Sequence, residues 1–385
     1  MSARVYMDWN ATAPLCEAAR EAFLRVALMD GNPSSVHREG RAVRSEVEAA
    51  RRTLASALNT EPAHVIFTSG ATEAANLVLT PDYRMGRAPL AIGALYVSAV
   101  EHKAVHDGGR FAAGQTRTFP VDARGVADLA ALDAILAVHD AAAGIPMVAL
   151  MLANNETGVI QVVDKASALV RAHDGWLHVD AVQAAGKIAI DFSDLGADTM
   201  ALSAHKLGGP QGVGALVAGT RATVTRRLHG GGQERGRRAG TENVAGIAAF
   251  GAAAVAAQEG LASLAEQAQW RDALAERVKA QGAVVLGEGA DRLPQTLCLA
   301  GEGFGSEVQV MNMDLAGVMV SAGSACSSGK VKASRVVEAM GRADLAPFAL
   351  RISGGWASTE DDWIKCGDAW LAAWKRIGAR RREVA

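Results

Sequence analysis

The chain has 385 residues, of which 50% are hydrophobic, and its formal net charge at pH 7 is −2. A chain of this length can bury more than one apolar core, so we expect two domains. The 39 Lys and Arg balance 41 Asp and Glu. This leaves no overall basic field, so nucleic acid is not an expected partner.

The cellular setting follows from what the sequence lacks. Residues 1–8 carry an acid early and have no long apolar run, so we expect no secretory signal. The longest apolar stretches, 90–100 and 145–153, are too short to cross a bilayer and suit buried strands. The four cysteines lie far apart, which predicts neither a disulfide framework nor a zinc site. We therefore expect a cytoplasmic protein that does not contact membranes.

In chain order, short apolar runs alternate with segments long enough for helices. The expected strands are 64–68, 95–98, 147–152, 176–180 and 199–203. Continuous apolar strands separated in this way predict an α/β sheet covered by helices on both faces. Several of them lead directly into polar or glycine residues, and ligands of such sheets bind beyond the carboxyl ends of the strands. We expect these loops to converge on one site.

The first such loop is 70–76, Gly-Ala-Thr-Glu-Ala-Ala-Asn, which follows a strand and opens a helix. Free N–H groups at a helix amino terminus suit a phosphate, and the Thr72 hydroxyl adds a donor. An ordinary capped helix after a glycine turn is the alternative interpretation.

Asp180 ends an apolar strand, where a carboxylate needs a partner. A protonated pyridine nitrogen would be a suitable one, although an Asp at this place also commonly caps the next helix. Gln183 is three residues further and is either a donor to a ring oxygen or an exposed helix residue.

The run Ser203-Ala204-His205-Lys206 places an amine beside two hydrogen-bonding side chains. Ser and His can bind phosphate, and a lysine amine can react with a carbonyl group. A surface lysine in a glycine-rich turn is the alternative, but it leaves the flanking pattern unexplained.

The long alanine-rich segment 244–281 reads as a helix that carries the chain out of the large domain. Strand-like runs at 296–299 and 318–320 then predict a smaller domain. Before this helix, the loop 230–243 combines glycines with three arginines. It is either an anion-binding loop or a solvated basic loop.

Two residues in the predicted smaller domain are candidates for a catalytic or substrate-binding role. Cys326 lies among small residues, in Ser321-Ala-Gly-Ser-Ala-Cys-Ser-Ser-Gly329, which favours an accessible thiol over a buried one. The other cysteines, Cys16, Cys298 and Cys366, have apolar or helical surroundings and are predicted to be structural. Arg351 follows an apolar stretch and is either a clamp for a carboxylate or part of a surface ion pair.

Taken together, these blocks resemble the cysteine desulfurases, pyridoxal-phosphate enzymes of the class V aminotransferase group. The resemblance spans nearly the whole chain, through 8–12, 31–37, 68–74, 101–105, 154–158, 178–183, 203–206, 230–243 and 321–329. Three residues depart from the usual pattern. Trp9 and Ala13 replace the usual Asn and Thr, and Trp356 stands where a polar residue is common.

The resemblance implies a fold-type I α/β enzyme. Its large domain, 15–255, would contain a mainly parallel sheet, and a smaller α+β domain, 256–385 with 1–14, would carry the cysteine loop. It would be a homodimer with shared active sites. Its reaction would convert L-cysteine to L-alanine and leave the sulfur as a persulfide on Cys326. An acceptor protein, such as an iron–sulfur scaffold or a sulfur carrier, would then take the sulfur.

The resemblance also implies roles for single residues. Lys206 would carry the cofactor and take the substrate α-proton, and Cys326 would attack the substrate sulfur. His102 would stack on the cofactor ring and act as acid or base. The remaining cofactor contacts would be Ala71, Thr72, Asn155, Asp180, Gln183, Ser203, His205 and, across the dimer, Thr241. Asn155 and Arg351 would bind substrate. No intrinsic metal is expected, although Cys326 could transiently contact an iron–sulfur cluster on a partner.

Three rival functions remain at this stage. A selenocysteine lyase or another class V lyase would not need Cys326. A non-catalytic sulfur-relay scaffold would keep the fold as a binding surface, but Lys206, Asp180 and His205 argue against it. A metal hydrolase would need ligand spacings, such as HExxH, that the sequence lacks.

Overall fold

The structure is a computed structural model that describes residues 4–85, 88–323 and 333–384. Cys326 and its neighbours 324–332 lie outside the described residues. The helices are α1 (Glu17–Ala27), α2 (Arg38–Ala57), α3 (Ala71–Val78), α4 (Lys103–His106), α5 (Leu129–Ala137), α6 (Val163–Ala172), α7 (Phe192–Leu195), α8 (Val244–Glu259), α9 (Leu261–Lys279), α10 (Ser306–Leu315), α11 (Arg335–Ala339) and α12 (Glu360–Val384). The strands are β1 (Val5–Tyr6), β2 (Val65–Thr68), β3 (Asp82–Met85), β4 (Ala88–Ser98), β5 (Thr116–Phe119), β6 (Ile145–Ala149), β7 (Trp176–Asp180), β8 (Thr199–Ser203), β9 (Gly214–Ala218), β10 (Val284–Leu286), β11 (Thr296–Ala300), β12 (Val318–Met319) and β13 (Ala349–Ser353).

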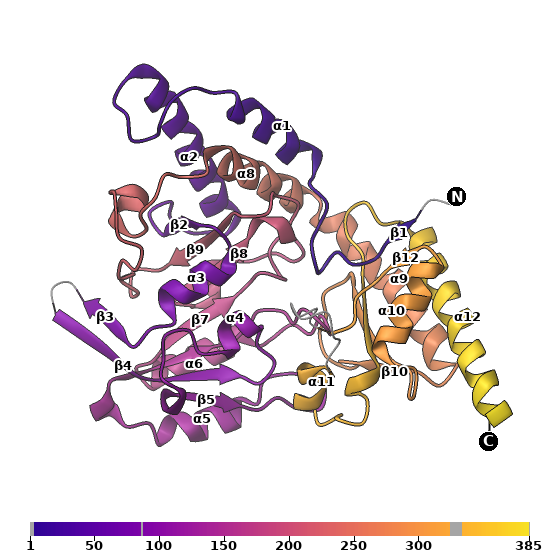
Figure 1. The fold of residues 1–385 in the computed structure, drawn as a ribbon. Coiled ribbons are helices and arrows are strands. Elements are labelled where there is room, and N and C mark those ends of the chain that lie inside the picture. Colours follow the sequence, from indigo (N-terminus) through magenta and orange to yellow (C-terminus); the bar gives the residue numbers. More distant parts are fainter. Residues whose placement is uncertain (1–3, 86–87, 324–332, 385) are drawn as a thin grey trace.

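An eight-stranded sheet forms the centre of the larger part of the molecule (Figure 1). Its strand order is β2-β9-β8-β7-β6-β4-β3, and β5 also pairs with β4. The strands β5, β4, β6, β7 and β8 run parallel, whereas β9 is antiparallel to both β2 and β8. The predicted α/β fold with a mainly parallel sheet is confirmed.

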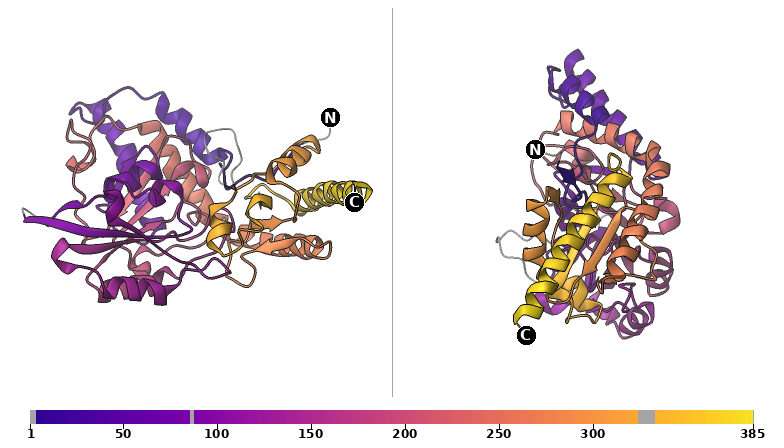
Figure 2. Two further views of the ribbon diagram at one scale, coloured as in Figure 1. Left: turned by 60° about the horizontal axis from the view of Figure 1, so that its bottom comes forward. Right: turned by 90° about the vertical axis from the view of Figure 1, so that its right-hand side faces the viewer.

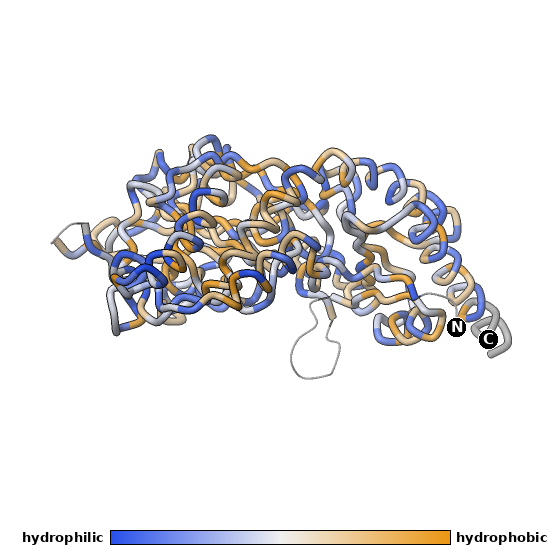
Figure 3. Tube along the Cα trace, turned by 90° about the horizontal axis from the view of Figure 1, so that it is seen from above, coloured by the Kyte–Doolittle hydropathy of each residue, from blue (hydrophilic) through white to orange (hydrophobic). Residues whose placement is uncertain are grey.

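Both faces of this sheet are buried. Along β6, Val148 belongs to one apolar core, while Met147 and Ala149 belong to another on the opposite face. Buried residues of α1, α2, α8, α5 and α6 share the core that contains Val148, whereas those of α3 and α4 belong to the core on the opposite face (Figure 1). Apolar segments accordingly concentrate in the interior (Figure 3). Burial on both sides explains why the strand sequences are continuously apolar, and β7 and β8 have the bounds predicted from them.

The smaller part of the molecule has its own sheets and core (Figures 1 and 2). Strands β10, β11 and β13 form an antiparallel sheet, and β1 pairs in parallel with β12. The side chains of Leu297, Ile352, Trp363 and Trp370 are buried in this core. Because β1 pairs with β12, the N-terminal segment lies with the C-terminal part of the chain, so it runs past the boundary between the two parts to reach α1.

The predicted single helix over 244–281 is wrong in one respect. Gly260 separates α8 from α9, and the two helices are bent by 61° at this break. The bend lets α8 pack on α1 and α2 while α9 packs on α12. Within the described residues, no single helix is long and apolar enough to span a membrane; only the bent pair α8 and α9 is, taken together.

A buried ion pair fixes the glycine-arginine loop 230–243 to the large sheet. Glu234 receives hydrogen bonds from Arg51 Nη1 and Nη2 at 2.7 and 2.9 Å and from the Phe67 backbone N–H at 3.0 Å. The side chains of Arg51 and Glu234 are only 3% and 1% exposed. Glu234 itself has a positive φ of 49°, a conformation that non-glycine residues adopt at a cost. The ion pair holds this strained backbone in place.

The substitution Glu234→Gln should therefore be strongly destabilising. It removes the buried carboxylate that pairs with Arg51 and leaves the guanidinium with the partly exposed Glu48, 3.2 Å from its Nε. Breaking a buried ion pair from one side typically costs about 3–5 kcal/mol. The matched control is Glu46→Gln in the exposed Arg25–Glu46 pair, where we expect a loss of about 1 kcal/mol or less. Urea unfolding followed by circular dichroism measures both. Equal midpoints for the two variants would contradict the structural role of Glu234.

Candidate active site

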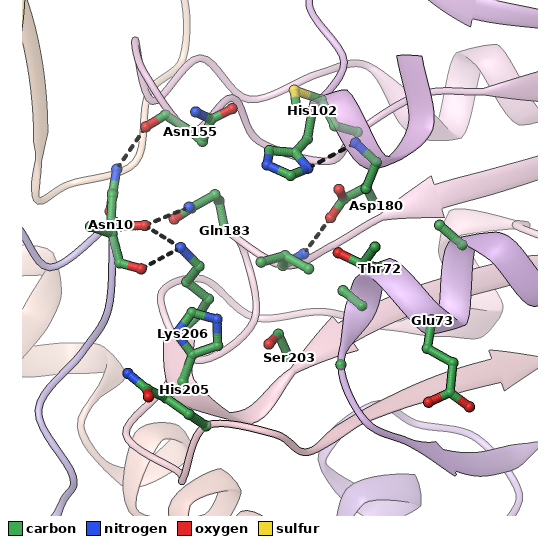
Figure 4. A pocket seen from close by; sticks show the side chains of 18 of the residues that line it. Asn10, Thr72, Glu73, His102, Asn155, Asp180, Gln183, Ser203, His205 and Lys206 are labelled. Atoms are coloured by element: carbon green, nitrogen blue, oxygen red, sulfur yellow. Dashed lines mark hydrogen bonds between the residues drawn. The ribbon is translucent and has the colours of Figure 1, made fainter. Parts of the chain in front are cut away.

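One cavity of about 560 Å³ lies where the loops after the central strands converge (Figure 4). Its walls come from the segments that follow β2, β4, β6, β7 and β8, and from residues 10–11 and Arg351 of the smaller part. This is the edge at which the carboxyl ends of the parallel strands meet, as expected for an open α/β sheet. The cavity therefore forms at the junction of the two parts.

Most of the residues singled out from sequence line this cavity. They are Ala71, Thr72, His102, Asn155, Asp180, Gln183, Ser203, His205, Lys206 and Arg351. Thr241 does not line it; its side chain is exposed on the loop 230–243. Cys326 lies outside the described residues.

Lys206 is the central basic group of the cavity. It follows β8 in a short 3-10 turn, and its Nζ donates to the backbone carbonyls of Asn10 at 2.6 Å and Ala11 at 2.7 Å (Figure 4). Burial, together with the Arg351 guanidinium, lowers the pKa of Lys206 to about 8. The neutral, nucleophilic form of this amine is therefore far more populated near neutral pH than that of an ordinary lysine.

The lowered pKa of Lys206 predicts how the amine reacts with small electrophiles. Below pH 8 the amine is mainly protonated and unreactive, so acetylation of Lys206 by acetic anhydride should rise about tenfold between pH 7 and 9 and then level off. Peptide mass spectrometry of the cofactor-free protein measures this. In the urea-unfolded chain the same lysine should keep gaining reactivity beyond pH 10. A folded-state profile identical to the unfolded one would show that the pKa is not lowered.

Asp180 places a carboxylate at the end of β7. Its Oδ1 accepts a hydrogen bond from the Val182 backbone N–H at 2.9 Å, and the side chain is buried. Burial raises the pKa of Asp180, while the nearby His102 and Lys206 oppose that rise. A buried carboxylate that accepts one hydrogen bond from the described part of the chain retains acceptor capacity for a cationic ligand group.

The helix α3 presents its amino terminus to the cavity. Gly70 caps it without a side-chain hydrogen bond, so the first N–H groups of the helix stay available. The neighbouring strand β9 needs a glycine to approach this loop, because a Cβ on Gly214 would lie 2.6 Å from the Gly70 Cα. With Thr72 and Ser203 beside it, this end of the cavity offers donors for an anion.

His205 adds a neutral imidazole to the same region. Burial, followed by the charges of Lys206 and Lys187, lowers the pKa of His205 to about 4. Its Nδ1 is 3.1 Å from the Thr12 hydroxyl. A neutral imidazole has one N–H and can donate one hydrogen bond to an anion without adding a second positive charge.

Arg351 enters the cavity from strand β13 of the smaller part. Its Nη2 donates to Asp8 Oδ1 at 2.7 Å, and its Nη1 donates to the Asn155 carbonyl at 3.0 Å. Its Nε is buried and has no hydrogen-bond partner among the residues that the structure describes. An unsatisfied guanidinium N–H is costly in a protein interior, so Arg351 is suited to donate a hydrogen bond to an anionic ligand group.

The three arginines of the loop 230–243 do not face the cavity. Arg238 pairs with Glu73 at 2.8 Å, and Arg237 donates to the Ala63 carbonyl at 2.7 Å. Arg235 approaches Glu48. Of the two interpretations of this loop, binding of an anion is not supported for these three side chains within a single chain. They instead bind carboxylates and a carbonyl of the protein itself and so attach the loop to it.

Asn10 is a cavity residue that the sequence reasoning did not select as a site residue. Its carbonyl accepts from both Lys206 Nζ and Gln183 Nε2 (Figure 4). Its side chain is buried, and Nδ2 donates to Thr296 Oγ1 at 2.9 Å. The signal was present in the motif Asp8–Thr12, but a neutral amide far from Lys206 in sequence gives no chemical reason to be chosen.

The two unusual tryptophans contact each other. The rings of Trp9 and Trp356 are 4.6 Å apart in an edge-to-face arrangement. Trp9 also packs directly on Gly355, where any Cβ would overlap its ring. The pair therefore packs the segment that carries Asp8 and Asn10 against the end of β13.

Comparisons with known proteins agree with this geometry. A sequence model of the family described as aminotransferase class-V matches residues 5–362. The chain belongs to the class-V aminotransferase family. It is 36% identical to an IscS-like cysteine desulfurase of Mycobacterium tuberculosis, over 99% of this chain and 98% of that protein. It is 39% identical to a cysteine desulfurase of Cereibacter sphaeroides, over 88% and 87% of the two chains. The crystal structure of a NifS-like protein from Rickettsia africae matches with a TM-score of 0.87 at 28% identity, over 97% and 99% of the chains.

Members of this family use pyridoxal 5′-phosphate, and this chain is a pyridoxal-phosphate enzyme. The residues present fit that group. A partly buried amine, a buried carboxylate with free acceptor capacity and a helix amino terminus without a side-chain cap all line one cavity. These would suit an aldehyde, a pyridine nitrogen and a phosphate, respectively. Among the residues that the structure describes, no group of three or more His, Cys, Asp or Glu could hold a metal.

Proposed function

We propose that this protein is a cysteine desulfurase that converts L-cysteine to L-alanine and keeps the sulfur as a persulfide on Cys326. The observation that carries the proposal is the partly buried Lys206 amine, with its lowered pKa, in one cavity with Asp180 and Arg351. Relatives named cysteine desulfurase match almost the full chain, which gives the substrate and the class of reaction.

The cofactor would be held by residues from four loops of the large sheet. Lys206 would bind it covalently, Asp180 would pair with the pyridine nitrogen, and Gln183 would donate to the ring oxygen. His102 would stack on the ring, and Asn155 would contact cofactor or substrate. The phosphate contacts would be Ala71, Thr72, Ser203 and His205. When bound, the cofactor supplies an electron sink for the substrate carbons.

The chain's own residues would bind and activate the substrate around this group. The Arg351 Nε, which no described residue pairs with, would donate to the substrate carboxylate. The Lys206 amine, once free, would take the proton from the substrate Cα, and its lowered pKa suits a general base near neutral pH. The Cys326 thiolate would attack the substrate sulfur, forming an S–S bond while the Cβ–S bond breaks.

Turnover of L-cysteine by the cofactor-loaded protein tests this proposal. With a thiol reductant, we expect alanine and sulfide in equal amounts. A protein that releases alanine from selenocysteine but not from cysteine would instead be a selenocysteine lyase. A protein that, once free pyridoxal phosphate is removed, shows no visible absorption from bound cofactor would be a non-catalytic scaffold.

The acceptor of the sulfur and the cellular setting are also proposals. An iron–sulfur scaffold or a sulfur-carrier protein would take the persulfide sulfur, and Cys326 could then transiently contact a cluster on that partner. The proposed setting is the reducing cytoplasm. Cys16, Cys298 and Cys366 are free thiols in the structure, which is compatible with such a compartment.

A homodimer with shared sites is proposed to explain Thr241. This residue is exposed and lies outside the cavity of its own chain, on a loop anchored by Glu234. In a dimer it would reach the phosphate in the partner's site. Mixing inactive Lys206→Ala and Thr241→Ala protomers should restore activity, since mixed dimers have one site without either change. An active protein that sediments as a monomer would contradict this arrangement.

A further inference from the structure

A second buried lysine, Lys187, lies directly behind the cavity. It follows a tight turn after β7 in which Gly186 has a φ of +70°. A Cβ on Gly186 would lie 2.8 Å from the Ala257 Cβ and 2.9 Å from the Leu207 Cβ, so this turn is packed closely against its surroundings. Lys187 is only 7% exposed and does not line the cavity. A lysine is rarely buried without a specific reason.

The Lys187 amine contacts amides rather than carboxylates. Its Nζ donates to Gln183 Oε1 at 2.7 Å and to Asn10 Oδ1 at 3.4 Å. Within the described part of the chain, no carboxylate forms an ion pair with it. Burial lowers the pKa of Lys187 well below its usual value, and the positive charges of Lys206 and Arg351 act in the same direction. The group is therefore suited to be a hydrogen-bond donor rather than a counter-charge.

The contact with Lys187 determines which end of the Gln183 amide faces which neighbour. The Asn10 carbonyl can only accept, so the group 3.0 Å from it must be the Gln183 NH₂. The opposite end, Oε1, then receives the Lys187 amine. Without Lys187, this oxygen would be buried without a partner and would favour other orientations of the side chain. Gln183 lines the cavity, so the orientation of its amide decides whether a hydrogen-bond donor or an acceptor faces a ligand at this position.

Lys187 also contacts the residue that receives Lys206. The Asn10 side-chain oxygen accepts from Lys187, while the Asn10 carbonyl accepts from Lys206 Nζ and Gln183 Nε2 (Figure 4). The two lysines thus act on one buried residue from two sides. Any shift of Asn10 would move an acceptor of the Lys206 amine.

We propose that Lys187 is a positioning residue whose buried amine holds Gln183 in one orientation, with the Gln183 NH₂ group directed to the Asn10 carbonyl and to the cavity. The inference rests on the proposed function, because the group that would receive the Gln183 NH₂ is the ring oxygen of pyridoxal phosphate. Lys187 itself touches neither cofactor nor substrate in this arrangement.

The test compares cofactor binding in Lys187→Met, Gln183→Leu and the double variant. Met keeps the length of the lysine stem but removes the donor. We expect Lys187→Met to raise the Kd for pyridoxal phosphate about tenfold or more, and to shift the visible absorption maximum of the cofactor bound on Lys206. The matched control is Lys165→Met on the exposed surface of α6, which should leave both quantities unchanged.

The double variant separates positioning from a general structural role. If Lys187 acts through Gln183, the Kd of the double variant should equal that of Gln183→Leu within about twofold, because energies of coupled residues do not add. It also remains informative if Lys187→Met alone does not fold, since removing both polar partners leaves neither of them unpaired. Multiplied effects in the double variant would overturn the inference, as would an unchanged Kd and spectrum in Lys187→Met. Failure of the unaltered protein to bind pyridoxal phosphate would instead refute the proposed function itself.

Discussion

Lys206→Ala should abolish the production of alanine from L-cysteine. The substitution removes the amine that would carry the cofactor and the group that would take the substrate α-proton. Loss of a positioned general base alone typically costs about 10²–10⁴-fold in rate, and loss of covalent attachment adds to it. We therefore expect activity at the level of free pyridoxal phosphate. Alanine release, measured by amino-acid analysis, gives the rate.

Borohydride reduction of the unaltered protein supplies an independent measurement. The reduced cofactor should be found on the peptide that contains Lys206, because burial gives this amine its lowered pKa and Asn10 and Ala11 hold it inside the cavity. Lys165→Ala, at an exposed position of α6, is the control and should keep both the adduct and the activity. An adduct on a different lysine would refute the assignment of Lys206.

The large sheet was predictable from sequence because its strands are buried on both faces. Continuous apolar runs such as 176–180 and 199–203 are typical of strands in the middle of a sheet that helices cover on both faces, and their bounds agree with β7 and β8. The position of the cavity followed as well, since Asp180 and Lys206 come at or just after the ends of these strands. For these strands, the local sequence pattern and the overall fold both require apolar side chains on the two faces.

The parts that were not predictable depend on contacts between distant segments. Asn10 reaches Lys206 only because the N-terminal segment joins the smaller part through β1 and β12 before it crosses to α1. The bend at Gly260 depends on α8 and α9 packing against different partners. One glycine in a helical pattern costs little, so it does not by itself predict a break.

The role of the arginines in the loop 230–243 illustrates the same limit. A cluster of arginines beside glycines is equally compatible with binding an anion and with holding a loop. The choice depends on whether carboxylates such as Glu73 lie nearby in space, 165 positions away along the chain from Arg238. Buried polar partners of this kind, including Lys187 behind Gln183, are decided by tertiary packing and leave no periodic signal in sequence.

Cys326→Ser should separate binding of L-cysteine from removal of its sulfur. The substitution leaves Lys206, Asp180 and Arg351 in place, so the cofactor should still load and cysteine should still change its visible absorption. Sulfur transfer should fall by on the order of a hundredfold or more, because a hydroxyl is a far poorer nucleophile toward sulfur than a thiolate. Cys326 lies outside the residues that the structure describes, so this prediction rests on the sequence around it.

The other three cysteines provide the comparison for this experiment. Burial raises the pKa of the Cys298 and Cys366 thiols, so neither forms a thiolate readily, and Cys16 is partly buried. Treatment with L-cysteine without reductant should therefore add one sulfur atom, about 32 Da, to the peptide containing Cys326 alone. Cys16→Ser is the matched control and should keep full activity. The proposed mechanism is wrong if the added sulfur appears on Cys16, Cys298 or Cys366, or if Cys326→Ser still releases sulfide from cysteine at the normal rate.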